Sequence, residues 1–567
     1  MASPTPSQAP PDAQSGPVPR RGEREVPAAA PAMAAVAAPL VAVLMVTWNR
    51  KEMVSSVLAA LARQTYPRER LLVTVTDNAS TDGTLEYLAQ RWKPEAIVEN
   101  STQAAHEPAF APPRVTGERN AGGFARLTLI ANRANMGGCG GFNTGFAYAE
   151  HAYTEPAPDF VWLVDDDVDL PPETLERLVG TAESDPSIGI VGTRTVDIAD
   201  RATTIESTIY LDRARGVMRD DAPPGHRLHE SHRRFVTACG APKGAGPYTG
   251  TTDVDVATAA SLLARWSAVR RVGFWDWRYF IYCDDADWCL RFGKAGYRVV
   301  LNLDAVVYHT PWNLKLTPAR LYYAQRNLVW MLRKVLPAGA LRRVVGRRVL
   351  GVLRDAAYAA THRRLFAAEI IRRTADDTVR DLGGKRGWDG PAFEPALEAL
   401  RRCGALRPGA RVAVLLCVPW APKLAEALRG HVAAELAAGR GLPGEVEPAW
   451  VYVRRNDVEL PAGDGVGVPP AEEVVYGHRR RSRLKKQLPF LRRPPTAVVV
   501  VDQSNDFPML RGRWNIHIDP KRPGMAQVER DGPRARAAFL ARWLVTAARV
   551  GRFVLTVRPY TSPTKYG

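Results

Sequence analysis

The sequence predicts an α/β protein with a doubly wound main sheet, because strand-like and helix-like segments alternate along its first half. An apolar run over 40–48 leads into a helix-like segment over 51–64, and the same succession recurs over 71–80 and 84–92. A further apolar run, over 160–164, ends in three consecutive aspartates. Because unpaired buried charges are costly, these carboxylates must lie at an open end of the strand. The sequence therefore predicts a sheet with a polar site at its carboxyl edge.

The chain is long enough for more than one domain. Its 567 residues, of which 46% are apolar, exceed what one hydrophobic core usually holds, so we expect about two or three domains. The first residues are rich in Pro, Ala, Ser and Gly, which bury too little apolar surface to offset the entropy of ordering. We predict four parts: a disordered tail over 1–38, an α/β domain over 39–334, a basic helical segment over 335–386 and a smaller C-terminal α/β domain over 387–567.

The end of the C-terminal domain shows the same alternation of patterns. We expect a helix over 535–550, where apolar residues recur at helical spacing, and a final strand over 553–559.

The charge of the chain is strongly positive. Lys and Arg total 77 against 59 Asp and Glu, which gives a formal net charge of +18. Nucleic acid, an anionic bilayer or an anionic substrate would each match this charge. We expect no nucleic acid partner, because aromatic residues are not interleaved with a basic patch. For the arginine-rich segment 335–386 two interpretations stay open: a helix that contacts an anionic membrane, and a solvated helix that links two domains.

Cysteine usage and hydropathy indicate the compartment. The six cysteines form no CxxC pair, which favours a reducing environment. No uncharged apolar run is long enough to span a bilayer, and the first residues lack a cationic head before an apolar segment. We therefore expect a cytoplasmic protein, with the inner face of the plasma membrane as the surface that it would contact peripherally.

Polar residues follow two of the predicted strands. Thr47, Asn49 and Arg50 come after the first strand, and Asp77 and Asn78 come after the second. In open α/β sheets ligands bind beyond the carboxyl ends of the strands, so both groups should face one crevice. We expect Asp77 to accept hydrogen bonds from a uracil or thymine ring or from a ribose. An Asx turn or a helix N-cap is the alternative for this residue.

A glycine-rich stretch over 135–145 precedes a predicted helix. Asn135, Gly137, Gly138 and Asn143 lie where the backbone could approach a ligand closely. The stretch lacks the lysine of a P-loop and the spacing of a Rossmann fingerprint. These differences argue against ATP hydrolysis and dinucleotide binding.

The three aspartates are the strongest candidates for a metal site. Alternate residues of an extended segment point the same way, so we assign Asp165 and Asp167 to a divalent ion. Asp166 points the other way, and we expect it to contact the rest of the bound ligand. His309, after a later strand, is a candidate third ligand, or else a buried core histidine. Oxygen ligands of this kind favour Mg²⁺ or Mn²⁺.

Two adjacent carboxylates, Asp284 and Asp285, open a predicted helix that ends near Ala295. The helix dipole partly stabilises them, yet one of two close acids tends to have a raised pKa and can serve as a general base. A capping aspartate is the alternative.

The segment from about 200 to 247 contains an HxxHxxH spacing, made of His226, His229 and His232. We expect a solvated loop here rather than a metal site, because the residues around these histidines do not form one helical face.

Taken in order, the motifs resemble a known family. VTWNR, TDNASTDGT, NMGGCGGFNTG, WLVDDDV and IYCDDADWCLRFGKAGY, followed by YHTPWN, are similar to those of family 2 glycosyltransferases. These enzymes have the GT-A fold, a mixed doubly wound sheet, and transfer a sugar from a nucleotide diphosphate with inversion. The resemblance covers about 41–334, and within the family it is closest to bacterial galactofuranosyltransferases.

The resemblance implies a chemistry for the candidate residues. Asp165, Asp167 and His309 would hold Mn²⁺ or Mg²⁺, and Asp285 would be the base, with Asp284 beside it. The donor would be UDP-galactofuranose and the acceptor a cell-envelope glycan or a polyprenyl-diphosphate-linked saccharide. Two alternatives stay open: a rhamnosyltransferase that uses dTDP-rhamnose, and a non-catalytic protein that binds a nucleotide sugar. The oligomeric state is not implied.

Overall fold

The computed structural model describes residues 38–560, except for 312–317, 363, 388–391, 417–420, 457, 461–471, 478–485, 487, 491, 501–509, 511, 520–521 and 531. The predicted tail over 1–38 therefore lies outside the described residues, apart from Ala38.

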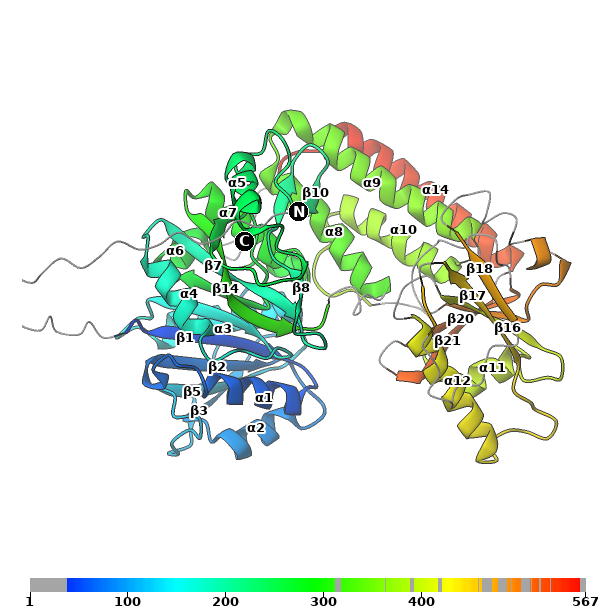
Figure 1. The fold of residues 1–567 in the computed structure, drawn as a ribbon, viewed down its shortest axis with the longest axis horizontal. Helices are drawn as coiled ribbons and strands as arrows, with labels where there is room; N and C mark the ends of the chain where they lie inside the picture. Colours follow the sequence, from blue (N-terminus) through cyan, green and yellow to red (C-terminus); the bar gives the residue numbers. More distant parts are fainter. Residues whose placement is uncertain are drawn as a thin grey trace, which may run out of the picture. The chain divides into compact units, whose positions relative to one another are not determined.

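The first half of the chain builds a large mixed sheet (Figure 1). Its strands lie in the order β11 (Gly244–Ala245), β8 (Thr203–Glu206), β7 (Ile188–Asp197), β13 (Ser261–Arg265), β6 (Phe160–Asp165), β1 (Val41–Thr47), β2 (Leu71–Asp77), β5 (Arg126–Asn132), β3 (Ala96–Asn100) and β4 (Arg114–Val115). Two further strands, β12 (Thr251–Asp253) and β14 (Arg298–His309), pair with each other, and β14 also pairs with β7. A separate hairpin consists of β9 (Tyr210–Asp212) and β10 (Val217–Arg219).

The centre of this sheet is parallel and buried. β1 pairs in parallel with β2 on one side and with β6 on the other, and its side chains from Val41 to Met45 are all buried. A strand that is covered on both faces needs a continuous apolar run, which the sequence supplies. The register pairs Thr47 with Asp77 and Val46 with Asp165. The polar residues that follow three strands therefore meet at one edge of the sheet.

Helices accompany this sheet along the chain (Figure 1). They are α1 (Lys51–Leu61), α2 (Thr84–Trp92), α3 (Gly137–Ala152), α4 (Thr174–Glu183), α5 (His229–Cys239), α6 (Trp266–Val272) and α7 (Asp284–Lys294), with short 3₁₀ helices η1 (Arg68–Arg70) and η2 (Trp277–Tyr279).

Helix α3 corrects one expectation. The glycines of 135–145 were predicted to precede a helix, but the helix already begins at Gly137, so most of them lie inside it. A Cβ atom on Gly141 would lie 2.4 Å from Cγ1 of Val46 on β1. Glycine is required here so that the helix can pack closely on the sheet.

The strand that carries His309 is placed by two contacts. β14 runs parallel to β7, and its end pairs His309 with Asp197. Next to it, Asp169 and Tyr308 form an antiparallel bridge, in which each backbone N–H donates to the carbonyl of the other residue at 3.0 and 2.9 Å. This bridge holds the chain that follows the three aspartates beside the end of β14.

The segment from 200 to 247 was predicted to be a loop, and this was wrong in part. It contains β8, β9, β10, β11 and α5. His232 on α5 is buried, and its Nδ1 lies 3.0 Å from the hydroxyl of Tyr210 on β9. The structured part therefore rests on buried polar contacts, which a search for an apolar helical face does not detect.

A group of long helices follows the first sheet. They are α8 (Pro318–Val335), α9 (Ala338–Thr361), α10 (Leu365–Val379) and, from the far end of the chain, α14 (Pro533–Thr556). Trp543 on α14 donates from its indole to the carbonyl of Leu353 on α9 at 3.0 Å. The strand predicted over 553–559 was wrong, because α14 continues to Thr556 and Phe553 and Val554 pack against the main core.

The C-terminal part forms a second sheet. Its strands lie in the order β15 (Glu394–Pro395), β21 (Arg522–Arg530), β20 (Trp514–Asp519), β19 (Ala497–Val500), β16 (Arg411–Leu416), β17 (Ala449–Arg455) and β18 (Glu472–Tyr476). The five strands from β20 to β18 are parallel, and the described helices α11 (Ala396–Arg402) and α12 (Ala421–Ala437) accompany them. The predicted α/β class, with a large mixed sheet and a second sheet, is confirmed. Among the described residues, no helix combines the length and the apolar character needed to cross a bilayer.

Candidate functional site

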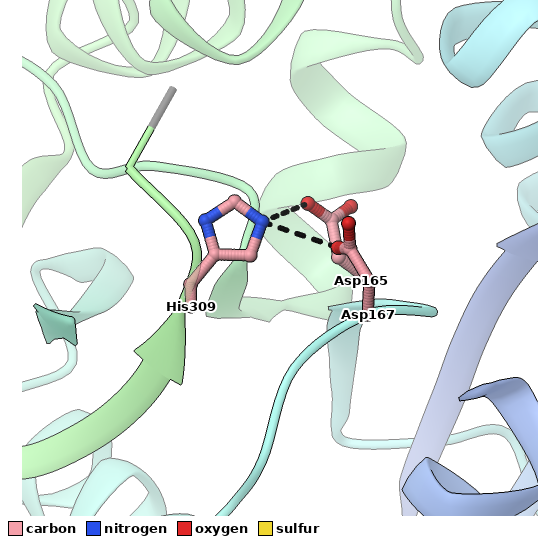
Figure 2. A group of neighbouring side chains, drawn as sticks. All are labelled: Asp165, Asp167 and His309. Carbon is pink, nitrogen blue, oxygen red and sulfur yellow. Dashed lines mark hydrogen bonds and ion pairs between the residues drawn. The ribbon is translucent and has the colours of Figure 1, made fainter. Parts of the chain in front are cut away.

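Asp165, Asp167 and His309 come together at the carboxyl edge of the first sheet (Figure 2). Nε2 of His309 lies 3.1 Å from Oδ1 of Asp167 and 3.9 Å from Oδ2 of Asp165. One ligand atom from each residue can be chosen so that all three lie within 4.8 Å of one another. Two carboxylate oxygens and an imidazole nitrogen at this spacing fit a single divalent ion such as Mn²⁺ or Mg²⁺. Of the described residues, no other such group of His, Cys, Asp and Glu side chains occurs.

Asp166, between the two candidate ligands, is paired with an arginine. Nη1 of Arg50 lies 2.6 Å from Oδ1 of Asp166 and 3.1 Å from Oδ2 of Asp167. Burial raises the pKa of Asp166, and the positive charge of Arg50 opposes this effect. The two predicted donor-binding residues therefore neutralise each other and fix the backbone of the aspartate turn. A direct contact of either residue with a donor stays a prediction.

Asp77 has a carboxylate oxygen directed into the protein without a partner. Its side chain is buried, Oδ2 accepts a hydrogen bond from the backbone N–H of Ser80 at 3.2 Å, and Oδ1 has no hydrogen-bond partner. Burial raises the pKa of this carboxyl group. This bond reaches the backbone three residues on, not two as in an Asx turn, and it leaves one acceptor of the carboxylate unsatisfied. A buried acceptor without a donor is costly unless a ligand supplies one.

Thr47 and Asn49 flank the same edge. Thr47 is buried and pairs with Asp77 in the sheet register. The backbone N–H of Asn49 donates to the hydroxyl of Ser80 at 2.8 Å, and its side-chain oxygen accepts from the backbone N–H of Thr81 at 2.7 Å. These contacts tie the turn after β1 to the turn after β2 at one edge of the sheet.

The asparagines near the glycine-rich helix are engaged within the protein. The side chain of Asn78 donates to the carbonyl of Gly137 at 2.8 Å, and that of Asn135 accepts from the N–H of Gly137 at 2.9 Å. Asn143 is fully buried, and its amide both donates to and accepts from the backbone of Trp275, at 2.9 and 3.0 Å. These side chains therefore form hydrogen bonds with the backbone of the protein itself, which the sequence did not indicate. Their predicted contacts with a donor are untested.

The two predicted glycines differ in surroundings. Gly137 has a φ of +74°, and a Cβ atom there would lie 2.1 Å from the carbonyl oxygen of Phe280. It must be glycine for this reason alone. A Cβ atom on Gly138 would meet no atom within 4 Å, so space is open beside it.

Asp284 and Asp285 form the first turn of α7. Oδ2 of Asp285 accepts from the backbone N–H of Ala259 at 3.2 Å, and the carbonyl of the next residue, Ala260, accepts from the N–H of Asp165 at 3.1 Å. The candidate base and the candidate metal site are therefore anchored on neighbouring residues of one segment.

The two carboxyl groups are electrostatically coupled. Burial and the nearby charge of Asp285 raise the pKa of Asp284 to about 8. Burial also raises the pKa of Asp285, although the N–H groups of Ala286 and Ala259 stabilise its charged form. In such a pair the protons leave in two steps, and the first leaves one carboxylate beside one neutral acid. Both carboxyl groups accept backbone hydrogen bonds, Asp284 from the N–H of Asp285 and Asp285 from the N–H groups of Ala286 and Ala259.

The segment before α7 has an unusual backbone. Phe280, Tyr282 and Cys283 have φ angles of 66, 71 and 61°. Residues other than glycine adopt this region rarely, at a cost of about 1–3 kcal/mol each, so surrounding contacts must hold them.

Two buried residues of α8, which the sequence did not suggest, hold this segment. Arg326 donates to the carbonyls of Arg278 and Tyr279 at 2.9 and 3.1 Å. The amide of Asn327 donates to the carbonyls of Tyr279, Ile281 and Tyr282 at 2.9, 2.8 and 2.8 Å. Both side chains are completely buried. A polar Arg-Asn pair inside the apolar pattern of 321–332 is the signal that could have identified them.

The three histidines of the HxxHxxH spacing do not form a metal group among the described residues. Nε2 of His226 instead lies 2.8 Å from Oδ2 of the buried Asp255.

Part of the chain is similar to known proteins. Residues 118–331 match the family model described as glycosyltransferase like family 2. Among solved structures, the mannosyltransferase PcManGT from Pyrobaculum calidifontis, in complex with GDP-Man and Mn²⁺, is 19% identical over 60% of this chain and 74% of that chain, with a TM-score of 0.34. Residues 1–349 of S. aureus TarS, in complex with UDP, are 14% identical over 60% of this chain and 82% of that chain, also at 0.34.

GalNAc-T7 with UDP, GalNAc and Mn²⁺ is 12% identical over 52% of this chain and 47% of that chain, at a TM-score of 0.34. Curated proteins give no match. The family match therefore identifies residues 118–331 as similar to glycosyltransferase-like family 2.

Proposed function

We propose that this protein is an inverting, metal-dependent glycosyltransferase that moves a galactofuranosyl group from UDP-galactofuranose onto a lipid-linked or cell-envelope glycan. The observation that carries the proposal is the convergence of Asp165, Asp167 and His309 within 4.8 Å. Asp285 and Asp165 are hydrogen-bonded to the neighbouring residues Ala259 and Ala260. The choice of galactofuranose rests on the resemblance of the sequence motifs.

The donor would lie across the strand ends. The unpartnered Oδ1 of Asp77 supports a contact with a ring N–H of uracil, because such a donor would satisfy the buried acceptor. Asp165, Asp167 and His309 would hold Mn²⁺ or Mg²⁺ at the donor's diphosphate. When bound, the ion acts as a Lewis acid that offsets negative charge on the departing diphosphate.

The acceptor would react on the opposite side of the sugar. Asp285 takes the proton from an acceptor hydroxyl while that oxygen attacks the anomeric carbon, and the nucleotide diphosphate leaves from the other face. A single displacement inverts the configuration. Asp284, whose pKa is raised to about 8, keeps its proton near neutral pH and adds no second negative charge beside the donor.

A polyprenyl-diphosphate-linked acceptor would present its saccharide at the inner face of the plasma membrane. The formal charge of +18 supports a peripheral contact with such an anionic surface.

A donor screen tests the proposal. Purified protein with Mn²⁺ is incubated with UDP-galactofuranose, dTDP-rhamnose and other nucleotide sugars, together with glycan acceptors, and products are detected by mass. We expect a hexose added from UDP-galactofuranose, and product formation at least about 100-fold slower in the Asp285→Asn variant.

Two results would change the conclusion. Product from dTDP-rhamnose alone would replace the proposed donor. Tight binding of a nucleotide sugar without transfer or hydrolysis, for any donor and acceptor, would favour a non-catalytic binding protein.

A further inference from the structure

A basic groove lies between α9 and α14, remote in the sequence from the residues of the candidate site. The two helices run side by side in opposite directions (Figure 1), and a Cβ atom on Gly346 of α9 would lie 2.9 Å from Cγ1 of Val554 on α14. The groove has a volume of about 470 Å³. It is lined by Arg342, Arg343, Gly346, Arg347, Leu350, Gly351, Arg354 and Val554.

Three of the four arginines that line this groove have no side-chain partner in the described part of the chain. Within the described part of the chain, the side chains of Arg342, Arg343 and Arg347 are exposed and take part in no hydrogen bond or ion pair, whereas that of Arg354 pairs with Asp355 at 3.1 Å. Arg348, on another side of α9, donates to the carbonyl of Gly216 at 2.9 Å. The helix thus uses some arginines for structure and leaves three positive charges unneutralised.

Few negative charges lie on the two helices. α14 contains no Asp or Glu, and the single acidic residue of α9 is Asp355. A groove with this balance attracts a polyanion or a surface that carries many phosphates.

Apolar side chains are exposed beside the arginines. Leu350, within the groove, is 48% exposed, and Leu544 and Leu555 on α14 are 56% and 67% exposed. Arginines next to exposed leucines are typical of helices that lie in the interface of an anionic membrane. No aromatic residue lines the groove, so stacking on nucleic acid bases has no platform there.

We propose that the groove between α9 and α14 binds the phosphate headgroups of anionic lipids and so docks the protein on a membrane surface. Arg342, Arg343 and Arg347 would contact phosphates, and Leu350 would enter the boundary of the acyl chains. This proposal does not depend on the transferase activity, because binding to vesicles needs neither sugar nucleotide nor catalysis.

Vesicle co-sedimentation tests the docking surface. The full chain is mixed, without nucleotide, with vesicles of phosphatidylcholine alone or of phosphatidylcholine with phosphatidylglycerol. Binding is expected only to the second kind and should weaken as salt is raised. The triple variant Arg342→Gln, Arg343→Gln, Arg347→Gln should bind about 100-fold more weakly, since each arginine near an anionic surface contributes about a factor of five.

A matched triple variant controls for net charge. Arg63→Gln, Arg91→Gln and Arg270→Gln remove the same formal charge from exposed arginines that likewise have no partner in the described structure. We expect this variant to bind vesicles within about 3-fold of the unmodified protein, because screening over about 10 Å isolates distant charges. Equal thermal unfolding temperatures of both variants would show that folding is preserved.

Four results would overturn the proposal. The first two are an equal loss of vesicle binding in the two triple variants and equal binding of the unmodified protein to the two kinds of vesicle. The third is binding of an oligonucleotide through the groove arginines without binding to vesicles. The fourth is burial of the groove in a dimer that the groove triple variant dissociates.

Discussion

Helix α8 holds the segment that leads to the candidate base Asp285. A change in α8 should therefore lower the reaction rate without lowering the affinity for UDP. Asn327→Leu keeps the shape of the side chain but removes the amide that donates to the carbonyls of Tyr279, Ile281 and Tyr282. The segment that these carbonyls belong to leads directly into Asp284 and Asp285. Without the amide, the strained φ angles before α7 lose a main restraint.

The magnitude follows from these bonds. The amide has two hydrogens, and each buried carbonyl left without a donor costs about 1–3 kcal/mol. Two such carbonyls should therefore destabilise the native segment by about 2–6 kcal/mol relative to a relaxed one. A displacement of about 1 Å at a reacting group lowers the rate by about 100-fold. We therefore expect kcat to fall by about 100-fold while the affinity for UDP with Mn²⁺ changes by less than about 3-fold.

Steady-state kinetics and calorimetry with UDP and Mn²⁺ measure the two quantities. Thr546→Val is the matched control, because it removes a buried hydrogen bond to Arg372 between α10 and α14 and should lower stability without lowering kcat. Asn327→Asp, which places oxygens against the carbonyls, should be worse than Asn327→Leu. Full kcat in Asn327→Leu, or an equal loss of UDP binding, would refute the reasoning.

Three further predictions concern the base, its neighbour and the glycine helix. Asp285→Asn should lower kcat by about 100-fold or more while UDP binding stays nearly unchanged, and comparable losses of both would contradict its role as base. If ionised Asp284 weakens donor binding, kcat/KM should fall as pH rises through the raised pKa of about 8, and Asp284→Asn should abolish this alkaline fall; a fall that persists in the variant would assign it to another group. Gly141→Ala, which brings a Cβ atom 2.4 Å from Val46, should lower the free energy of unfolding in urea by about 1–3 kcal/mol, whereas Gly138→Ala, with nothing within 4 Å, should not; equal effects would refute the packing argument.

The strand ends of the first sheet could be predicted from the sequence because their local patterns are unambiguous. The runs that form β1, β2 and β6 are apolar and end in polar residues, and parallel strands bring such ends to one edge. His309 comes from a strand much later in the chain, and its place beside Asp167 depends on the bridge between Asp169 and Tyr308, a long-range contact that no local pattern encodes.

Other features depend on tertiary contacts. Asn143 was expected near a ligand because it lies in a glycine-rich stretch, but its amide is matched to the backbone of Trp275. Arg326 and Asn327 are buried in α8, and their partners are carbonyls of a segment that lies 48 and 46 residues earlier in the chain, respectively. Polar residues buried against backbone carbonyls have the same sequence signature as exposed ones, so only the fold reveals them.

The central claim is that Asp165, Asp167 and His309 hold one divalent ion to which the donor's diphosphate binds. Electron paramagnetic resonance measures it directly, because the signal of free Mn²⁺ decreases as the ion binds. Titration with UDP present should show one bound Mn²⁺ per chain in the unmodified protein and a loss of affinity of at least about 10-fold in His309→Ala and in Asp167→Asn, the order expected when a group that fixes a metal is removed. Binding of Mn²⁺ with the same stoichiometry and affinity in both variants would contradict the account.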